Sequence, residues 1–174
     1  YVLSLLEFFQ LSKKILQNIL QRIFFNTIFT TYLSIFCYLF LYFSNLLHLK
    51  FILYTLLISC ISSDIGGFVF GKYFGGPRLT KISPKKTYAG AIGSIVLACL
   101  TISILFYFFT NTISFFVIII GIVTSLGCQL GDLFFSLLKR KAKIKDTGSI
   151  FPGHGGILDR VDGILLGIPV GFFS

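Results

Sequence analysis

The sequence of 174 residues is poor in charge, because only 12% of its residues are Asp, Glu, Lys or Arg. Soluble domains carry about 25% charged residues. So few charges cannot cover a water-facing surface around a core, and this excludes a soluble globular protein. The 22 phenylalanines and the 55% share of hydrophobic residues also exclude a disordered chain, since disordered segments have few aromatic residues. What remains is a polytopic membrane protein.

Three further absences narrow the class of protein. The four cysteines lie in apolar runs and form no Cys-x-x-Cys pair, so we expect buried small side chains rather than disulfides or a zinc site. No Walker A pattern is present, which excludes a P-loop nucleotide site. The chain has no Met, not even at position 1, and its last apolar run stops at Ser174. We therefore expect a fragment of a longer protein.

Long apolar runs predict an all-α fold in the membrane. A spanning helix needs about 20 apolar residues. The sequence has a partial run at 1–11, four long runs at 23–45, 51–70, 89–109 and 113–138, and a last run that begins near 161. We predict a polytopic integral membrane helical bundle of about five to six transmembrane helices. It forms a single membrane-embedded catalytic domain over residues 1–174, without internal repeats.

The basic residues are concentrated in three polar connections. Residues 12–22, 71–88 and 139–160 hold fourteen of the fifteen Lys and Arg residues. Two predicted crossings separate each basic connection from the next, so all three fall on the same side of the membrane. The positive-inside rule makes that side cytoplasmic. We therefore expect a multi-pass protein of the cell (inner or plasma) membrane, with the basic loops and the active site facing the cytoplasm.

Two aspartates fall inside predicted membrane helices. Asp64 lies late in the 51–70 run, and Asp132 lies late in the 113–138 run. A carboxylate at membrane depth costs about 2.5–3.5 kcal/mol on insertion scales and often marks a functional cavity. Both aspartates are within two turns of a basic loop, so we expect them to open onto one vestibule. The alternative is a structural ion pair with a nearby Lys. Glycines beside both acids are expected to let the helices pack closely.

The third basic loop holds the densest group of polar residues. Asp159 and Asp162 are three residues apart, which places both carboxylates on one face at the start of a helix. Glycines at positions 153, 155 and 156 allow unusual backbone angles and leave amides able to approach a phosphate. Carboxylates that hold Mg²⁺, with Lys and Arg beside them, are typical of metal-bound phosphate sites. For His154, the spacing leaves open a general base, a phosphate donor or a capping residue.

These residues resemble the phosphatidate cytidylyltransferase (CDP-diacylglycerol synthase) family. The family's C-terminal pattern runs Ser-x-x-Lys-Arg, Lys-Asp, His-Gly-Gly and Asp-Arg-x-Asp. Eleven positions within 27 residues match it: Ser136, Lys139, Arg140, Lys145, Asp146, His154, Gly155, Gly156, Asp159, Arg160 and Asp162. The resemblance extends over roughly 58–170 and includes the Ser-Pro-Lys-Lys-Thr segment at 83–87. One departure is Ala89, where many members carry Glu. Members are generally longer, with helices before the part matched here.

The resemblance implies a reaction in which phosphatidate attacks the α-phosphorus of CTP, giving CDP-diacylglycerol and pyrophosphate. It implies Mg²⁺ as cofactor, with room for a second cation such as K⁺. The implied metal ligands are Asp132 and Asp159, with Asp162 as ligand or neighbour and Asp64 as a weaker candidate. The implied catalytic residues are Asp132, Asp159, Asp162, Lys139 and Arg140. The implied substrate-binding residues are Ser83, Lys85, Lys86, Ser136, Lys145, His154, Gly155, Gly156 and Arg160. The two serines could instead bond to the helix backbone.

Other functions stay open at this point. A CTP-dependent kinase of a polyprenol or another lipid alcohol would share the acids and the basic loops. An ion-coupled transporter would use Asp64 and Asp132 as cation sites, but it leaves the acids beside His-Gly-Gly unexplained. An inactive truncated copy is a third alternative. The expected partners are CTP and phosphatidate in the bilayer, with no nucleic acid. The sequence leaves open the acyl-chain preference and the oligomeric state, a homodimer included.

Overall fold

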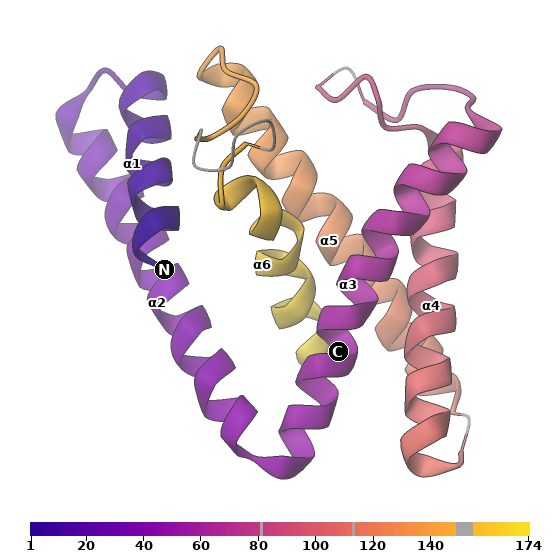
Figure 1. Ribbon diagram of the computed structural model, residues 1–174. Helices are drawn as coiled ribbons and strands as arrows, with labels where there is room; N and C mark the ends of the chain where they lie inside the picture. Colours follow the sequence, from indigo (N-terminus) through magenta and orange to yellow (C-terminus); the bar gives the residue numbers. More distant parts are fainter. Residues whose placement is uncertain (81, 113, 149–154) are drawn as a thin grey trace.

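The computed structural model describes residues 1–80, 82–112, 114–148 and 155–174. Within these ranges the chain forms six α-helices and no strand, apart from an isolated bridge between Arg78 and Thr87. The helices are α1 (Val2–Ile15), α2 (Ile19–Asn45), α3 (Leu47–Phe74), α4 (Tyr88–Thr110), α5 (Phe115–Lys141) and α6 (Leu158–Phe172) (Figure 1). This confirms the predicted all-helical fold.

Four of these helices, α2 to α5, are long and apolar enough to cross a membrane. Their outward side chains are apolar, as Phe108 and Phe116 illustrate with exposed fractions of 77% and 75%. The predicted runs at 1–11 and from 161 form the shorter helices α1 and α6, of 14 and 15 residues. A full crossing takes about 20 residues. The described part of the chain is therefore a polytopic bundle with four full-length membrane helices.

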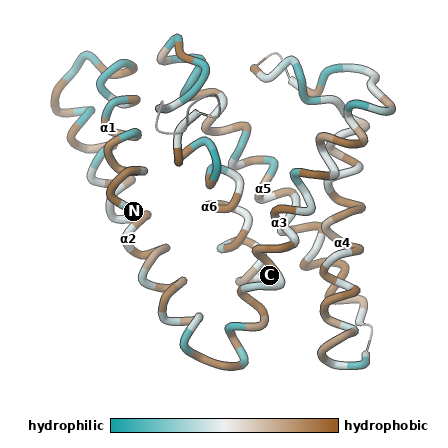
Figure 2. Tube along the Cα trace, viewed as in Figure 1, coloured by the Kyte–Doolittle hydropathy of each residue, from teal (hydrophilic) through white to brown (hydrophobic). Residues whose placement is uncertain are grey.

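The connections between the helices alternate between two ends of the bundle. Figure 1 shows the α2–α3 and α4–α5 turns at one end, whereas α1, α3 and α5 all finish at the other end. Figure 2 shows that hydrophilic residues gather at this second end, which we call the basic end. It carries Lys13 and Lys14 in the last turn of α1, Lys72 in that of α3 and three basic residues in that of α5. The predicted grouping of the basic connections at one end is confirmed.

The short helix α1 packs on three neighbours near the basic end. The ring of Phe8 stacks on Phe29 of α2 with centroids 3.7 Å apart. Leu11 is buried in a cluster that also contains Phe135 of α5 and Leu158 of α6. These contacts hold α1 against the first turn of α6.

Glycines bring the backbones of neighbouring helices together. A Cβ added to Gly66 of α3 would lie 2.5 Å from the carbonyl oxygen of Gly93 in α4. A Cβ on Gly131 of α5 would lie 2.5 Å from the carbonyl oxygen of Asp162 in α6. Small residues are the usual means of close helix contact in membranes. The expected role of the glycines beside the two intramembrane aspartates is therefore confirmed.

Replacing Gly131 with Ala is expected to destabilise the α5–α6 contact by about 1–3 kcal/mol, because the new methyl group overlaps a backbone carbonyl that cannot rotate away. Gly71→Ala is the matched control, since its Cβ would lie 3.3 Å from the Thr87 hydroxyl and 3.6 Å from the Cα of Gly90, without a clash against a backbone carbonyl. Both changes gain the same helix propensity of about 1 kcal/mol, so their difference isolates the clash. Unfolding midpoints in detergent measure it, and equal midpoints would contradict the packing described.

Candidate active site

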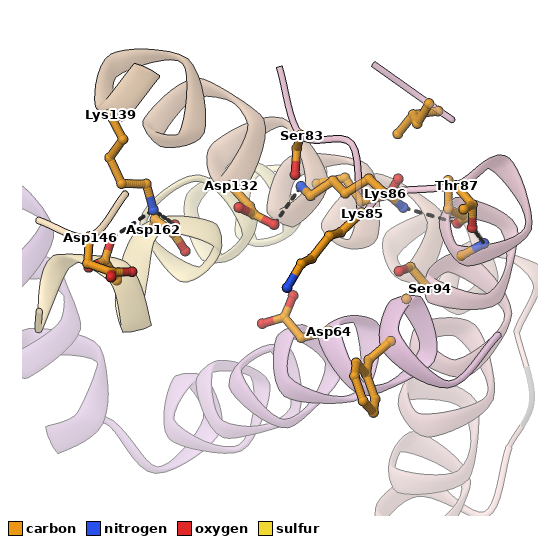
Figure 3. Close-up of a pocket in the computed structure, with 17 residues that line it drawn as sticks. Asp64, Ser83, Lys85, Lys86, Thr87, Ser94, Asp132, Lys139, Asp146 and Asp162 are labelled. Carbon is orange, nitrogen blue, oxygen red and sulfur yellow. Dashed lines mark hydrogen bonds and ion pairs between the residues drawn. The ribbon is translucent and has the colours of Figure 1, made fainter. Parts of the chain in front are cut away.

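All five aspartates of the chain line one cleft at the basic end. The cleft has a volume of about 470 Å³. Asp64 enters from α3, Asp132 from α5 and Asp162 from α6, while Asp146 comes from the connection before α6 and Asp159 from the first turn of α6 (Figure 3). The vestibule expected for the two intramembrane aspartates is therefore present. It also receives the acids of the C-terminal motif.

Three lysines line the same cleft as the aspartates. The Lys86 ammonium lies 2.5 Å from Asp132 Oδ2. The Lys139 ammonium lies 2.7 Å from Asp159 Oδ1 and 3.8 Å from Asp162 Oδ2. Figure 3 shows Lys85 pointing toward Asp64. Among the described residues, five carboxyl groups and three lysines line the cleft, so acidic side chains outnumber basic ones there.

The α3–α4 connection folds back on itself and places its lysines over the cleft. The amide of Leu79 donates to the carbonyl of Lys86 at 2.8 Å. The hydroxyl of Thr87 accepts from the amide of Gly90 at 3.1 Å and so caps the N-terminus of α4, which is a preferred role for threonine. With both ends fixed, Lys85 and Lys86 reach the cleft. Ser83 lines it from the same connection.

Asp132 is the most accessible of the paired carboxylates, with 35% of its side chain exposed. The Ser136 hydroxyl, one helical turn further along α5, donates to Asp132 Oδ1 at 3.3 Å. The Ser136 hydroxyl therefore bonds a side chain and not the helix backbone, which was one alternative considered from the sequence, and its contact with a phosphate stays a prediction. The two oxygens of Asp132 face a hydroxyl and an ammonium group.

Asp162 is buried beside other acids in the second turn of α6. Burial, followed by the negative charge of Asp132, raises the pKa of Asp162 to about 7, although the ammonium of Lys139 works in the opposite direction. The amide of Gly163 donates to Asp162 Oδ1 at 2.8 Å. A cation near Asp162 and Asp132 would relieve the repulsion between them.

Asp159 is held by a larger set of donors. Oδ2 accepts from the amide of Thr147 at 2.8 Å, from its hydroxyl at 3.0 Å and from the amide of Gly156 at 3.0 Å, while Oδ1 accepts from Lys139. Burial alone would raise the pKa of Asp159, but these hydrogen bonds outweigh it and lower the pKa below its ordinary value. Asp159 is therefore charged. Its Oδ2 accepts from Thr147 and Gly156, and its Oδ1 accepts from Lys139.

One predicted catalytic residue, Arg140, and several predicted substrate-binding residues lie outside the cleft or are bonded within the protein. Arg140, Lys145 and Arg160 are exposed and are not among the residues that line the cleft. Gly155 has a left-handed φ of 84°, and the amide of Gly156 bonds Asp159. The amide of Gly156, which we expected to approach a phosphate, thus serves a carboxylate of the protein. His154 lies outside the described residues.

Sequence reasoning missed four residues at or beside the cleft. Gln129 and Ser94 line it, and the Gln129 amide donates to the carbonyl of Ala91 at 3.2 Å. Gln129 lies three residues before Asp132 on one helix, a spacing that could have revealed it. Thr147 and Glu7 stand behind Asp159. No local signal marks Glu7, which lies in an apolar run far from the motif.

The acids fit the chemistry of a hard divalent cation without forming a ready-made metal site. Within the described ranges, no three His, Cys, Asp or Glu side chains converge closely enough to hold a metal ion. The ammonium groups of Lys86 and Lys139 lie against the carboxylates instead. Carboxylate oxygens are the ligands that Mg²⁺ prefers. The described lining of the cleft has more aspartates than lysines. A cation bound here would compete with these lysines for the same oxygens.

Comparisons with known proteins show which family the chain resembles over its full length. The model of a family described as the cytidylyltransferase family matches residues 1–174. The phosphatidate cytidylyltransferase of Rickettsia bellii (strain RML369-C) is 45% identical over 130 residues, covering 68% of this chain and 55% of that protein. The phosphatidate cytidylyltransferase of Mycobacterium tuberculosis (strain ATCC 25618 / H37Rv) is 40% identical over 114 residues, covering 65% and 35%. Phosphatidate cytidylyltransferase 5, chloroplastic, of Arabidopsis thaliana is 44% identical over 120 residues, covering 63% and 29%. The chain spans about half the length of these relatives, or less.

Proposed function

The chain belongs to the cytidylyltransferase family, and we propose that it forms the catalytic part of an enzyme that transfers CMP from CTP to phosphatidate. The products are CDP-diacylglycerol and pyrophosphate. One observation carries the proposal, which is the convergence of all five aspartates and three lysines on one cleft at the basic end of the membrane helices. A water-soluble triphosphate and a membrane lipid can meet only at such a boundary. The names of the similar proteins support the same reaction.

We further propose that the basic end faces the cytoplasm of the cell membrane. The positive-inside rule favours this orientation, because Lys and Arg are retained on the cytoplasmic side. CTP then enters the cleft from the aqueous side. Phosphatidate enters from the bilayer, between helices whose outer surfaces are apolar.

In the proposed reaction a phosphate oxygen of phosphatidate forms a bond to the α-phosphorus of CTP, and the bond to the pyrophosphate oxygen breaks. Such transfers depend on in-line positioning and on neutralisation of charge. Lys85 and Lys86 reach the cleft from a connection rather than from a helix, so Lys86 can exchange its partner Asp132 for a phosphate and Lys85 can bind a phosphate beside it. Ser83 can donate a hydrogen bond to the same phosphates. Lys139 pairs with Asp159 and Asp162 and so holds these two carboxylates in position.

We propose that Asp132, Asp159 and Asp162 hold Mg²⁺, with Asp64 as a further candidate and K⁺ as a candidate second cation. Bound Mg²⁺ would supply positive charge that orients the triphosphate and stabilises the leaving pyrophosphate. The excess of carboxylates over lysines in the lining supports this assignment. So does the raised pKa of Asp162, which burial and the charge of Asp132 produce.

The test is product formation from CTP labelled at the α-phosphorus, with phosphatidate in detergent micelles. Labelled lipid is expected with Mg²⁺ and is expected to be absent when the metal is chelated. The 174-residue chain is assayed together with a chimera in which it replaces the matching segment of the Rickettsia bellii relative, so that the remaining length is supplied. Lipid labelled from γ-labelled CTP, with none from α-labelled CTP, would replace this proposal with a lipid kinase.

A further inference from the structure

Glu7 is the sixth acid of the chain and the one that lies outside the cleft. It is buried on α1, with 3% of its surface exposed. Oε1 accepts from the amide of Ile157 at 3.0 Å, and Oε2 accepts from the amide of Leu158 at 2.8 Å and the hydroxyl of Thr147 at 2.9 Å. A buried carboxylate is costly unless such bonds are made. Glu7 therefore ties α1 to a segment 140 to 151 positions away in the sequence.

The partners of Glu7 include the backbone groups at the start of α6. The first amides of a helix have no partner within it, and negative charge is favourable at that end of the helix dipole. The amides of Ile157 and Leu158 are satisfied by Glu7, although Glu7 comes from a different helix. The first turn of α6, which carries Asp159, is thus capped from outside by α1.

Thr147 links Glu7 directly to Asp159. Its hydroxyl lies 2.9 Å from Glu7 Oε2 and 3.0 Å from Asp159 Oδ2. Gly156 completes the contact, because a Cβ there would lie 2.5 Å from Glu7 Oε2 and 2.4 Å from the Thr147 hydroxyl. Only a residue without a side chain leaves room for the two carboxylates to share Thr147. This gives a physical reason for the second glycine of the His-Gly-Gly motif.

We propose that Glu7 is a positioning residue for the cleft. By holding Thr147 and the first amides of α6, it fixes where Asp159 and Asp162 present their carboxylates. The role in the reaction rests on the function proposed above. The anchor itself rests only on the hydrogen bonds described. It makes α1, which carries none of the motif residues, part of the structure that positions the site.

Glu7→Gln tests the proposal with almost no change in volume. The new amide group turns one acceptor into a donor, which then faces donors of the α6 segment. Loss of an outer partner of this kind typically lowers activity about 10- to 100-fold. We expect kcat to fall by that factor, with the KM for CTP changed by less than about 3-fold. Hydrogen exchange is expected to become about 10-fold faster or more at one of the two amides of Ile157 and Leu158, because each bonds a different oxygen of Glu7 and Gln keeps only one of these acceptors.

Phe8→Leu is the matched control. It loosens the packing of the same helix on α2 and leaves Glu7 in place. We expect a lower melting temperature, with kcat per folded protein and exchange at the start of α6 as in the wild type. The proposal is overturned if Glu7→Gln behaves like Phe8→Leu, with reduced stability but unchanged kcat and exchange.

The two measurements also separate this inference from the proposed function. If the wild type makes no labelled lipid, the assigned reaction is wrong, and amide exchange in Glu7→Gln still decides whether the anchor exists. If the wild type is active, the kcat of Glu7→Gln decides whether the anchor positions the site. The double variant Glu7→Gln/Thr147→Val is expected to lose less kcat than the product of the two single losses, since both residues act through one contact.

Discussion

Replacing Asp132 with Asn is expected to lower the rate of CMP transfer about 100- to 1,000-fold, because one charged group at such a site contributes roughly 2.7–4 kcal/mol to transition-state stabilisation. Asp132 is the most exposed of the paired carboxylates and contacts Lys86 and Ser136. Asn keeps the shape and the acceptor toward Ser136 but removes the charge. The fold should survive, since the side chain is not buried in the core. The measurement is kcat with α-labelled CTP at saturating Mg²⁺.

Ser136→Ala is the control for Asp132→Asn. It removes the hydroxyl that donates to Asp132 Oδ1 at 3.3 Å and leaves the charge. We expect a loss of about 10-fold, at the low end of the range for a hydrogen bond to a charged group, because this bond is long and partly exposed. An Asp132→Asn enzyme with a rate within about 10-fold of the wild type would contradict the role given to this carboxylate. Raising the Mg²⁺ concentration should recover part of the rate if the loss arises from weaker cation binding.

Lys139→Met is expected to give the largest loss of stability among the cleft variants. The Lys139 side chain is 12% exposed, and its partners Asp159 and Asp162 are 11% and 12% exposed. Removing one partner of a buried ion pair costs about 3–5 kcal/mol, because the remaining charge stays buried without compensation. Activity should fall with it, since the two carboxylates then repel each other and the start of α6 shifts.

Two further results should accompany this loss. The destabilisation should shrink at acidic pH, because without Lys139 the pKa values of both carboxyls rise and protonation removes the repulsion. Added Mg²⁺ should raise the melting temperature of Lys139→Met more than that of the wild type, since the cation takes the place of the ammonium group. Lys85→Met, which changes an exposed lysine of the same cleft, should leave the melting temperature nearly unchanged. Equal stability of the two variants would refute the buried pair.

The membrane architecture was predictable from the sequence because hydropathy and charge act locally. Apolar runs fixed the number of long helices, and the basic connections fixed their alternation. The ends of the helices were less predictable. The run assigned to 23–45 is a helix from Ile19, and that assigned to 51–70 continues to Phe74. Hydropathy marks the apolar part of a helix, whereas polar residues such as Gln21 and Arg22 extend the helix into the interface.

The candidate site was predictable only in part. Asp64, Asp132 and Lys86 could be expected in one cleft, since each acid in the membrane needs a polar surrounding. The exposure of Arg140 could not be foreseen, because it depends on which face of α5 meets α6. Glu7 could not be found either, as its partners lie more than 100 positions away. Contacts of this kind depend on the tertiary fold, and no local sequence pattern predicts them.

All five aspartates line the cleft and Glu7 is buried on α1, so the acidic side chains of this chain gather in the cleft and directly behind it. Lysines of the basic end that lie outside the cleft, such as Lys13, Lys14 and Lys72, therefore add to the positive field at this end of the bundle. A surface of this kind attracts anionic lipids by about 1 kcal/mol per basic residue near the bilayer. Phosphatidate would be enriched in the annulus around the protein before it reaches the cleft. Capture of the lipid then becomes a short lateral search, which should slow as ionic strength rises.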